Sequence, residues 1–409
     1  MSKRILVVCQ HFWPENFRIN DLCYGFTDHD VEVDVLCGEP NYPKGEWFEG
    51  YGAFRPKEEV HRGIRIFRCP EIRRKNNTSI RIFLNYISYP ITSSFAVRKL
   101  YKNKYDKVFI YSLSPVYMGR AGLKLAKKQG IEAVTYVMDL WPENLYSVLN
   151  FQNKLIRRIL YNTSTKYYQK SDKLICLSQE AKEILKERTG KSDDCFLIMP
   201  QCCEKFYEEP IRDQALVDRF GGQFNIVFAG NISPAQDFPV MVEAARLLKQ
   251  KGIKANWIIV GDGMSRKEAE EAVREAGLSE DFFFEGFKAP TEIPKYTNIA
   301  SALIACLAKS PLLDCTIPAK VMSYIAAGKP IVLGMDGEAN RTVNEYGCGF
   351  ATESGNAELL AESLETLAKM SDDERAEMGE RAKKLHFEQF ERDSNLARLT
   401  EFILDGESK

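Results

Sequence analysis

Short apolar runs alternate with longer helical patterns along this chain, an order typical of βα units built around a parallel sheet. Within the first 200 residues the runs predict strands over 4–9, 32–37, 64–69, 107–111, 133–138 and 173–177. The patterns between them predict helices over 20–27, 86–99, 118–128, 153–170 and 179–187. The sequence therefore predicts an α/β fold with a doubly wound sheet in this half.

A second series of the same kind begins near Asn225, after an irregular stretch that follows Pro200. It predicts strands over 225–229, 255–260, 282–285, 302–305 and 330–334, and helices over 239–251, 265–276, 316–327 and 356–370. We therefore predict two tandem Rossmann-like domains that face each other across a cleft. Their expected bounds are 1–200 and 223–385, with a linker over 201–222 and a C-terminal helix over 386–409 that crosses back to the first domain. Ligands of such sheets bind at the carboxyl ends of the strands.

The two halves carry opposite charge, although the whole chain is nearly neutral. Residues 1–200 hold 32 Lys and Arg against 22 Asp and Glu, whereas the remainder holds 24 against 35. This asymmetry suits two units with different partners, and the composition excludes disorder, collagen and coiled coil. The apolar run Ile5–Cys9 is too short for a signal peptide, and the stretch from Ile82 to Val97 contains Asn85 and Pro90, so we expect no membrane-spanning segment.

Eleven cysteines form no CxxC pair and mostly stand in apolar, strand-like contexts, which predicts buried, reduced thiols. The vicinal pair Cys202 and Cys203 could serve a redox or metal site, but no second Cys/His pair at ligand spacing accompanies it. Since the chain has only four histidines, we expect no histidine-rich metal site.

Two glycine turns follow predicted strands of the second half. Gly230 and Asn231 begin a loop that reaches Gln236, before a helix with Pro239 in its first turn. The second turn contains Gly261, Asp262 and Gly263. Glycine at a strand end lets the backbone approach a ligand, and a following helix N-terminus offers free N–H groups to an anion. Neither turn is a GxGxxG or Walker loop, and a purely structural role as a tight βα loop is the alternative for both.

The segment 316–330 predicts a helix with Thr316 as its N-cap, Pro318 in the first turn and Gly328 as the C-terminal stop. Lys320 would lie in the first turns, where the helix dipole disfavours a cation. A bound diphosphate would explain that position, with Ser323 and Tyr324 on adjoining faces. The alternative is a buried helix with one lysine whose charged end reaches water.

Polar and aromatic residues also follow two predicted strands of the first half. Asp139, Trp141 and Glu143 come after the fifth strand, and either carboxylate could orient an acceptor hydroxyl or act as a base. Capping of the next helix is the competing role. Pro14, Glu15 and Asn16 lie in a similar loop after the first strand. Trp and Pro side chains in such loops more often pack against the protein than bind a ligand.

Basic and apolar residues are concentrated between Arg55 and Lys104, where thirteen Lys and Arg face three acidic residues. Such a patch can bind an anionic bilayer, each nearby cation contributing about 1 kcal/mol. Ordinary solvated helix faces are the alternative, and nucleic acid is not expected because no RNA- or DNA-binding motif accompanies the charge. The expected membrane-contacting residues are Arg73, Arg74, Lys75, Arg81 and Phe83.

These motifs together resemble a family 4 glycosyltransferase with the GT-B fold, in the bacterial O-antigen and capsule branch that includes L-fucosamine transferases. The segment from Ile317 to Pro330 carries the most specific part of the resemblance. The resemblance implies a metal-independent transferase without a cofactor, with the nucleotide sugar in the second domain and the acceptor in the first. The implied donor-binding residues are Gly230, Asn231, Gln236, Gly261, Asp262, Gly263, Phe287, Thr316, Ile317, Pro318, Ser323 and Tyr324.

Two departures from the family pattern remove charge from the expected donor site. Cys315 and Ser323 occupy the positions of a frequent Glu-x7-Glu motif, and Asn231 and Gln236 replace the usual Arg and Lys of the phosphate loop. Lys320 and backbone N–H groups would then carry more of the diphosphate recognition.

We therefore expect a retaining glycosyltransferase that moves a sugar from a UDP-linked donor, such as UDP-N-acetyl-L-fucosamine, to a polyprenyl-diphosphate-linked saccharide in capsule or O-antigen synthesis. Its expected location is the inner face of the cell membrane, where the cytoplasmic protein would be peripheral. Lys320, Asp139 and Glu143 are the expected catalytic residues, and Pro14, Glu15, Asn16 and Trp141 the expected acceptor contacts. A sugar-nucleotide epimerase on the same scaffold, or a non-catalytic sugar-nucleotide or membrane-binding module, are the alternatives.

Overall fold

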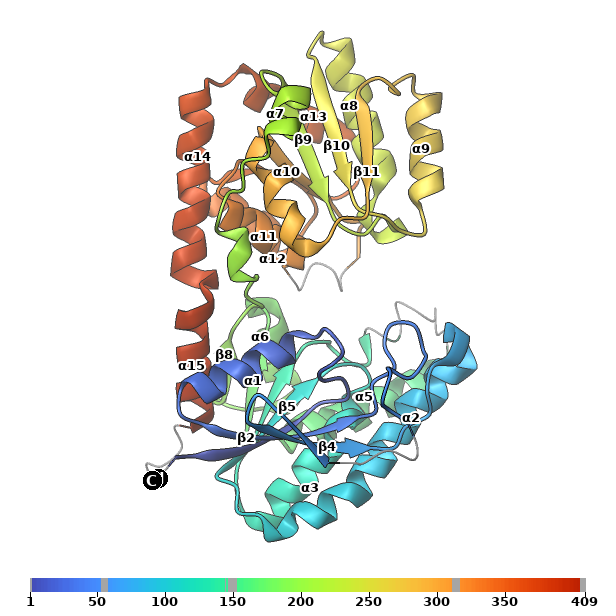
Figure 1. The fold of residues 1–409 in the computed structure, drawn as a ribbon, viewed down its shortest axis with the longest axis vertical. Coiled ribbons are helices and arrows are strands. Elements are labelled where there is room, and N and C mark those ends of the chain that lie inside the picture. The colour runs from blue at the N-terminus through green and yellow to red at the C-terminus, as the bar shows by residue number, and fades with distance from the viewer. Residues whose placement is uncertain (1, 53–57, 144, 146–152, 311–316, 405–409) are drawn as a thin grey trace. The chain divides into compact units, whose positions relative to one another are not determined.

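The computed structural model describes residues 2–52, 58–143, 145, 153–310 and 317–404. Contacts divide the chain into two compact units (Figure 1). Unit 1 comprises Met1–Met199 together with Asp393–Lys409, and unit 2 comprises Pro200–Arg392. The chain therefore leaves unit 1 once, completes unit 2, and returns to unit 1 in its last helix.

Unit 1 is built on an eight-stranded sheet with the order β3-β4-β2-β1-β5-β6-β7-β8. All neighbouring strands are parallel except β3 and β4, which pair as an antiparallel edge. The strands are β1 Arg4–Val8, β2 Glu32–Gly38, β3 Glu58–His61, β4 Ile64–Cys69, β5 Lys107–Ser112, β6 Ala133–Val137, β7 Lys173–Cys176 and β8 Phe196–Ile198. The helices are α1 Arg18–Asp28, α2 Ser79–Ala96, α3 Arg120–Gln129, α5 Lys154–Gln169, α6 Gln179–Thr189 and α15 Arg392–Leu404.

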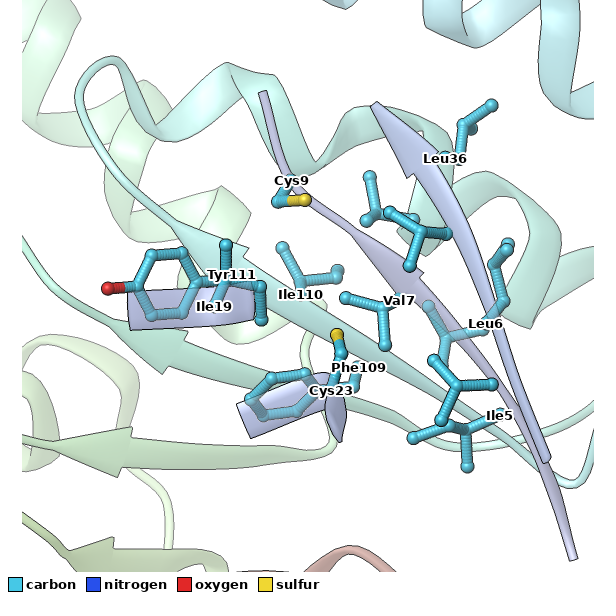
Figure 2. Packing of buried hydrophobic residues seen from close by; sticks show 14 of the residues in the cluster. Ile5, Leu6, Val7, Cys9, Ile19, Cys23, Leu36, Phe109, Ile110 and Tyr111 are labelled. Atoms are coloured by element: carbon cyan, nitrogen blue, oxygen red, sulfur yellow. The ribbon is translucent and has the colours of Figure 1, made fainter. Parts of the chain in front are cut away.

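The core of unit 1 contains side chains from the central strands and from segments far apart in the sequence. Figure 2 shows Val7 of β1 and Ile110 of β5 beside Ile19 and Cys23 of α1. Leu396, Leu399 and Ile403 of α15 belong to the same buried cluster. Gly25 leaves room for this packing, since a Cβ there would lie 2.1 Å from a methyl carbon of Leu396. Helix α15 is therefore an integral part of unit 1.

Unit 2 is built on a six-stranded parallel sheet with the order β11-β10-β9-β12-β13-β14. The strands are β9 Phe224–Ala229, β10 Ala255–Val260, β11 Phe282–Gly286, β12 Ala302–Cys306, β13 Ile331–Gly334 and β14 Gly349–Thr352. The helices are α7 Gln214–Phe220, α8 Phe238–Gln250, α9 Arg266–Glu275, α10 Ile293–Ile299, α11 Ala319–Ala327, α12 Glu338–Tyr346, α13 Ala357–Lys369 and α14 Asp372–Leu385. A π-helical turn, His386–Phe390, follows α14.

Alternate residues of the strands of unit 2 supply two separate cores, one on each face of its sheet. Ile226 and Phe228 of β9 belong to one buried cluster, and Val227 and Ala229 belong to the other. Successive side chains of a strand point to opposite faces, so a strand buried on both faces is mostly apolar, and the buried polar residues Asn225 and Asn256 of β9 and β10 hydrogen-bond to each other (2.9 Å). This two-sided burial explains why the strands read as mostly apolar runs rather than as alternating patterns.

The structure places the predicted linker differently from the sequence analysis. Residues 201–222 contain α7, and Leu216 and Phe220 of this helix are buried in a core of unit 2. The predicted helix over 316–327 begins only at Ala319, with Pro318 in an extended conformation at its N-cap. Pro318 thus takes the N-cap position, and Thr316, the predicted N-cap and donor contact, lies outside the described residues.

Ten cysteines are described and none is disulfide-bonded, and eight of the ten are buried. Burial raises the pKa of the Cys37 and Cys306 thiols to about 12, which keeps them protonated. Among the helices that the structure describes, none combines the length and the apolar character needed to cross a bilayer.

Candidate functional site

Each unit has a point where the strand order reverses, and such points bind ligands in open α/β sheets. In unit 2 the chain moves from β9 outward to β10 and β11, and then returns to β12 on the other side of β9. The loops that follow β9 and β12 therefore leave the carboxyl edge of the sheet in opposite directions. In unit 1 the corresponding point lies between β1 and β5.

The two predicted glycine turns of unit 2 pack directly against each other. Gly230 N donates to Val260 O (2.9 Å), and Ile232 N donates to Asp262 O (2.9 Å). A Cβ on Gly261 would lie 1.9 Å from Gly230 O, and one on Gly263 would lie 2.1 Å from Ile232 O. These glycines are needed because the two loop backbones touch, which also brings both loops to one edge of the sheet.

Lys320 of α11 is directed at the loop that follows β9. Its Nζ donates to Gln236 Oε1 and lies 4.1 Å from the centre of the Phe228 ring. A Cβ on Gly230 would lie 2.8 Å from this Nζ. Burial lowers the pKa of the Lys320 ammonium from 10.5 to about 7. The structure thus brings Lys320, Gln236 and Gly230 together, in an arrangement that can receive an anion.

Two residues predicted to contact the donor are internal to unit 2 instead. Tyr324 is buried, and its hydroxyl accepts from Ala229 N (2.8 Å) and lies 3.3 Å from both Ala229 O and Ile304 O. Ser323 donates to Ala319 O (3.1 Å) within its own helix. Both therefore fix α11, with Tyr324 joining it to β9 and β12, while their contact with the donor stays a prediction.

The remaining predicted donor residues lie at or near the surface of unit 2. Asn231, Asp262 and Phe287 are exposed, and Asp262 forms an ion pair with Arg266 (3.7 Å). Ile317 and Pro318 are half-buried in front of α11.

The carboxylates that follow β6 are both engaged within unit 1. Asp139 Oδ2 accepts from Ser114 N (3.0 Å), which ties the loop after β6 to the loop after β5 at the reversal of strand order. Glu143 forms an ion pair with the buried Arg188 (3.2 Å). Asp139 stays half-exposed, whereas Trp141 is buried against Tyr117 with ring centres 5.0 Å apart. Trp141 is therefore a packing residue rather than an exposed acceptor contact.

The loop after β1 is folded inward at Glu15. This side chain is 2% exposed, and its Oε1 accepts from the backbone N of Asn41 (2.7 Å) and of Tyr42 (2.6 Å). Its Oε2 accepts from His11 Nδ1 (2.9 Å). Glu15 therefore holds two loops together, whereas Pro14 is half-buried and Asn16 is exposed. The predicted contact of these three residues with an acceptor stays a prediction.

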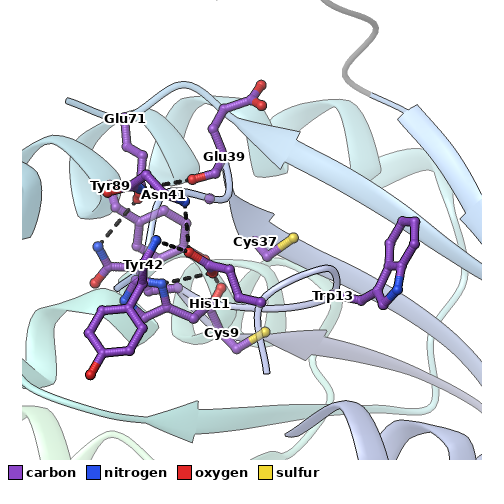
Figure 3. Close-up of polar contacts among 12 residues, drawn as sticks. Cys9, His11, Trp13, Cys37, Glu39, Asn41, Tyr42, Glu71 and Tyr89 are labelled. Carbon is purple, nitrogen blue, oxygen red and sulfur yellow. Dashed lines mark hydrogen bonds and ion pairs between the residues drawn. The ribbon is translucent and has the colours of Figure 1, made fainter. Parts of the chain in front are cut away.

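A buried polar network at the ends of β1, β2 and β4 was not predicted (Figure 3). Its centre is Glu71, whose Oε1 accepts from the side-chain amides of Asn41 and Asn85 and whose Oε2 accepts from Gln10. Arg74 Nε donates to Asn85 Oδ1 (3.1 Å), and Arg74 Nη2 donates to His11 Nε2 (3.3 Å). Because Arg74 is buried here, its predicted membrane contact is wrong.

Burial, reinforced by the charge of Glu15, raises the pKa of Glu71 from 4.5 to about 8. Between pH 4.5 and pH 8 the folded protein therefore holds a proton that the unfolded chain loses, so this group makes the free energy of unfolding decrease as pH rises through that window. We expect Glu71→Gln to flatten the decrease in Tm between pH 5.5 and pH 8. Thermal melts at a series of pH values measure this dependence for wild type, Glu71→Gln and the exposed control Glu49→Gln. Parallel plots of Tm against pH for all three proteins would contradict the raised pKa of Glu71.

Helix α2 has an unusual distribution of polar and apolar side chains. Its buried side carries Asn85, Tyr89, Ser93 and Ser94, and Tyr89 donates to Cys9 O (2.6 Å). Its solvent side exposes the apolar residues Ile80, Phe83, Leu84, Ile87, Ile91 and Phe95. Lys75 and Arg81 are exposed near its beginning, whereas Arg73 is paired with Glu46. A helix that buries polar groups and exposes a continuous apolar stripe is suited to contact another apolar surface.

Among the residues that the structure describes, no group of three or more His, Cys, Asp or Glu side chains is arranged to hold a metal ion.

Comparisons with known proteins cover both units. Residues 17–199 match Glycosyltransferase Family 4, and residues 213–385 match Glycosyl transferases group 1. The probable glycosyltransferase WbjE of Pseudomonas aeruginosa is 21% identical over 283 residues, 68% of this chain and 70% of WbjE. The putative teichuronic acid biosynthesis glycosyltransferase TuaH of Bacillus subtilis is 23% identical over 199 residues, 47% of this chain and 48% of TuaH.

A solved structure, that of Anabaena HepE in complex with UDP, matches the chain with a TM-score of 0.68 and 14% identity, covering 98% of this chain and 99% of HepE. The two α/β units, each built on a sheet of mainly parallel strands, agree with this likeness of fold. With a family 4 domain followed by a group 1 domain, the chain is a GT-B glycosyltransferase and belongs to the family that includes bacterial polysaccharide-biosynthesis enzymes.

Proposed function

We propose that the protein is a retaining glycosyltransferase that moves a sugar from a UDP-linked donor to a polyprenyl-diphosphate-linked saccharide. Binding of the donor by unit 2 is supported by the position of Lys320, which lies against Gly230 at the reversal of strand order. HepE, with the same fold, has been solved with UDP. Because the half of the chain after residue 200 carries more acidic than basic residues, recognition of a dianionic diphosphate must be local.

The chemistry proposed for the chain's own residues is mostly positioning and charge stabilisation. The bond between the anomeric carbon and the diphosphate oxygen breaks, and UDP leaves with the electron pair. Lys320 and backbone N–H groups in the first turn of α11 stabilise the charge on the departing diphosphate. The acceptor hydroxyl oxygen forms the new glycosidic bond, and its proton passes to Asp139, whose Oδ1 is the oxygen not used by Ser114 N. Glu143, held by Arg188, positions this loop.

A thermal-shift screen against UDP-, GDP- and dTDP-sugars tests the donor class, because a ligand stabilises the state that binds it. UDP-N-acetyl-L-fucosamine is the sugar that we expect to give the largest shift among UDP-sugars. Transfer of labelled sugar into a lipid extract then tests the reaction. Conversion of a UDP-sugar without any acceptor would point to an epimerase, and binding without turnover across the panel would point to a non-catalytic module.

The acceptor half of the proposal includes peripheral attachment of unit 1 to the cytoplasmic face of the membrane through α2. Its apolar stripe can enter the boundary between headgroups and acyl chains. Lys75 and Arg81, exposed near the beginning of the same helix, can then contact anionic headgroups. A lipid-linked acceptor would be reached from the same surface.

We expect Phe83→Asp combined with Ile87→Asp to weaken binding to phosphatidylglycerol vesicles by at least about tenfold, since each removes an apolar side chain worth about 1.5–3 kcal/mol when buried. Cosedimentation with vesicles measures the change. Val60→Asp, at an apolar side chain that is 68% exposed on the edge strand β3, is the matched control and should bind as wild type does. Equal binding by the double variant and wild type would refute attachment through α2.

A further inference from the structure

Tyr42, in the loop after β2, is an exposed aromatic ring fixed in place by the buried network of unit 1. The residue is 40% exposed, whereas the neighbouring Asn41 is fully buried. The Arg74 guanidinium lies 5.2 Å from the centre of the Tyr42 ring, and the rings of Phe17 and His11 lie 5.2 Å and 5.5 Å from it. The ring is thus supported from behind while part of its surface faces solvent.

The backbone at Tyr42 is held just as firmly. Its N–H donates to Glu15 Oε1, and the preceding N–H donates to the same oxygen. Glu15 is fixed in turn by His11, which accepts from Arg74. The two bonds of His11 fit the neutral ring with its proton on Nδ1, because a carboxylate can only accept and a guanidinium can only donate.

Such a network is costly, because the side chains of Glu15 and Arg74 are removed from water. Replacing buried ionic groups by apolar side chains often leaves stability unchanged or improved, so these groups are weak evidence of a need for stability. What the network does provide is a single position for the loops after β1 and β2. The most exposed member of that assembly is the Tyr42 ring (Figure 3).

We propose that Tyr42 is a stacking platform for the saccharide of the acceptor, with Glu15 and Arg74 as its positioning residues. A pyranose ring has an apolar face of C–H groups, and packing this face on a rigid aromatic ring buries apolar surface with little loss of side-chain entropy. The loop lies at the carboxyl edge of the sheet, where acceptor contacts are expected. This inference rests on the proposed function, because it assigns a subsite to the acceptor of that reaction.

The first experiment compares Tyr42→Ala, Tyr42→Leu and Tyr42→Phe in the full-length protein. We expect Tyr42→Ala and Tyr42→Leu to raise the KM for acceptor by about tenfold or more, with kcat changed less than about threefold, because stacking contributes to binding before the reaction. Tyr42→Phe keeps the ring and should retain the wild-type KM. Stabilisation by UDP, which tests unit 2, should be the same in all variants.

Tyr161→Ala is the matched control, because Tyr161 is also 40% exposed in unit 1 and also has an arginine, Arg188, 4.4 Å from its ring centre. It should leave the KM for acceptor unchanged. Glu15→Gln should raise the KM in the same direction as Tyr42→Ala if Glu15 positions the ring. An unchanged KM in Tyr42→Ala, or an equal loss in Tyr161→Ala, would overturn the proposal.

A binding measurement separates this proposal from the proposed function. Wild type and Tyr42→Phe should bind a subset of an immobilised glycan array in the presence of UDP, and Tyr42→Ala and Tyr42→Leu should lose that binding. This readout needs no turnover, so it decides the platform even when no donor supports transfer. Absence of wild-type binding to every glycan, or equal binding by wild type and Tyr42→Ala, would refute the platform whatever the outcome of the transfer assay.

Discussion

Replacing Lys320 by alanine is expected to lower turnover by about 10²–10³-fold, the usual cost of removing one group that stabilises developing negative charge. Lys320 Nζ lies against Gly230 and Gln236, and the net charge of the surrounding half-chain is negative. No broad positive field would therefore compensate for its loss. The substitution should lower kcat as well as the affinity for UDP. Single-turnover kinetics with saturating donor measure the chemical step separately from donor binding.

Lys267→Ala, at an exposed lysine of α9, is the control and should retain wild-type turnover. Without ligand, Lys267→Ala should melt as wild type does, and Lys320→Ala should melt at the same temperature or higher, because it removes a cation whose burial is a cost to folding. Because burial lowers the Lys320 pKa to about 7, the ammonium loses its proton as pH rises through neutrality in the absence of ligand. Affinity for UDP should therefore weaken from pH 6 to pH 8 in wild type and less so in Lys320→Ala. Wild-type turnover in Lys320→Ala would remove the basis of the proposed donor site.

Gly261→Ala is expected to destabilise unit 2 by about 3 kcal/mol or more, the range of substitutions that force a backbone clash. A Cβ at this position would lie 1.9 Å from Gly230 O, and the backbone φ of +145° is one that L side chains rarely adopt. The contact is between two backbones, so no side-chain rotation can relieve it. The loops after β9 and β10 must separate, and stabilisation by UDP should be lost as well.

Gly277→Ala is a control that separates the cost of the backbone clash at Gly261 from the cost of a positive φ. Gly277 has a φ of +69°, but a Cβ there meets nothing within 4 Å. Its substitution should cost only about 1 kcal/mol, the cost of the left-handed conformation alone. Chemical denaturation of both variants gives the comparison, and equal losses of free energy of unfolding would show that the packing of the two loops is not decisive.

Most of the fold was accessible from the sequence because burial on both faces of a sheet leaves a strong signal. Strands β9 and β10 read as apolar runs with one asparagine each, and the structure buries them on two sides. Strand β3, with the sequence Glu58–His61, lacks that signal because it is an antiparallel edge with alternate residues in solvent. Helix α12 was missed for a related reason, since its residues are mostly polar and only one side is buried.

The candidate sites were predicted unevenly. The glycine loops and Lys320 could be found because chain order puts them at strand ends of one sheet, and the structure confirms that Gly230, Gln236 and Lys320 meet. The role of Tyr324 could not be read from helical spacing, because spacing does not say which side faces the sheet. The network around Glu71 depends on three loops distant in sequence, and the only local signal was Asn85 in an otherwise apolar stretch.

The return of α15 to unit 1 has a consequence for synthesis on the ribosome. Leu396, Leu399 and Ile403 fill part of a core whose other residues are made about two hundred positions earlier. At about 5–20 residues per second, that interval lasts about 10–40 s. During this time the first unit emerges with an uncovered apolar surface, while all of the second unit is being translated. Unit 2 can thus close first, and the N-terminal unit is the last to reach its final packing.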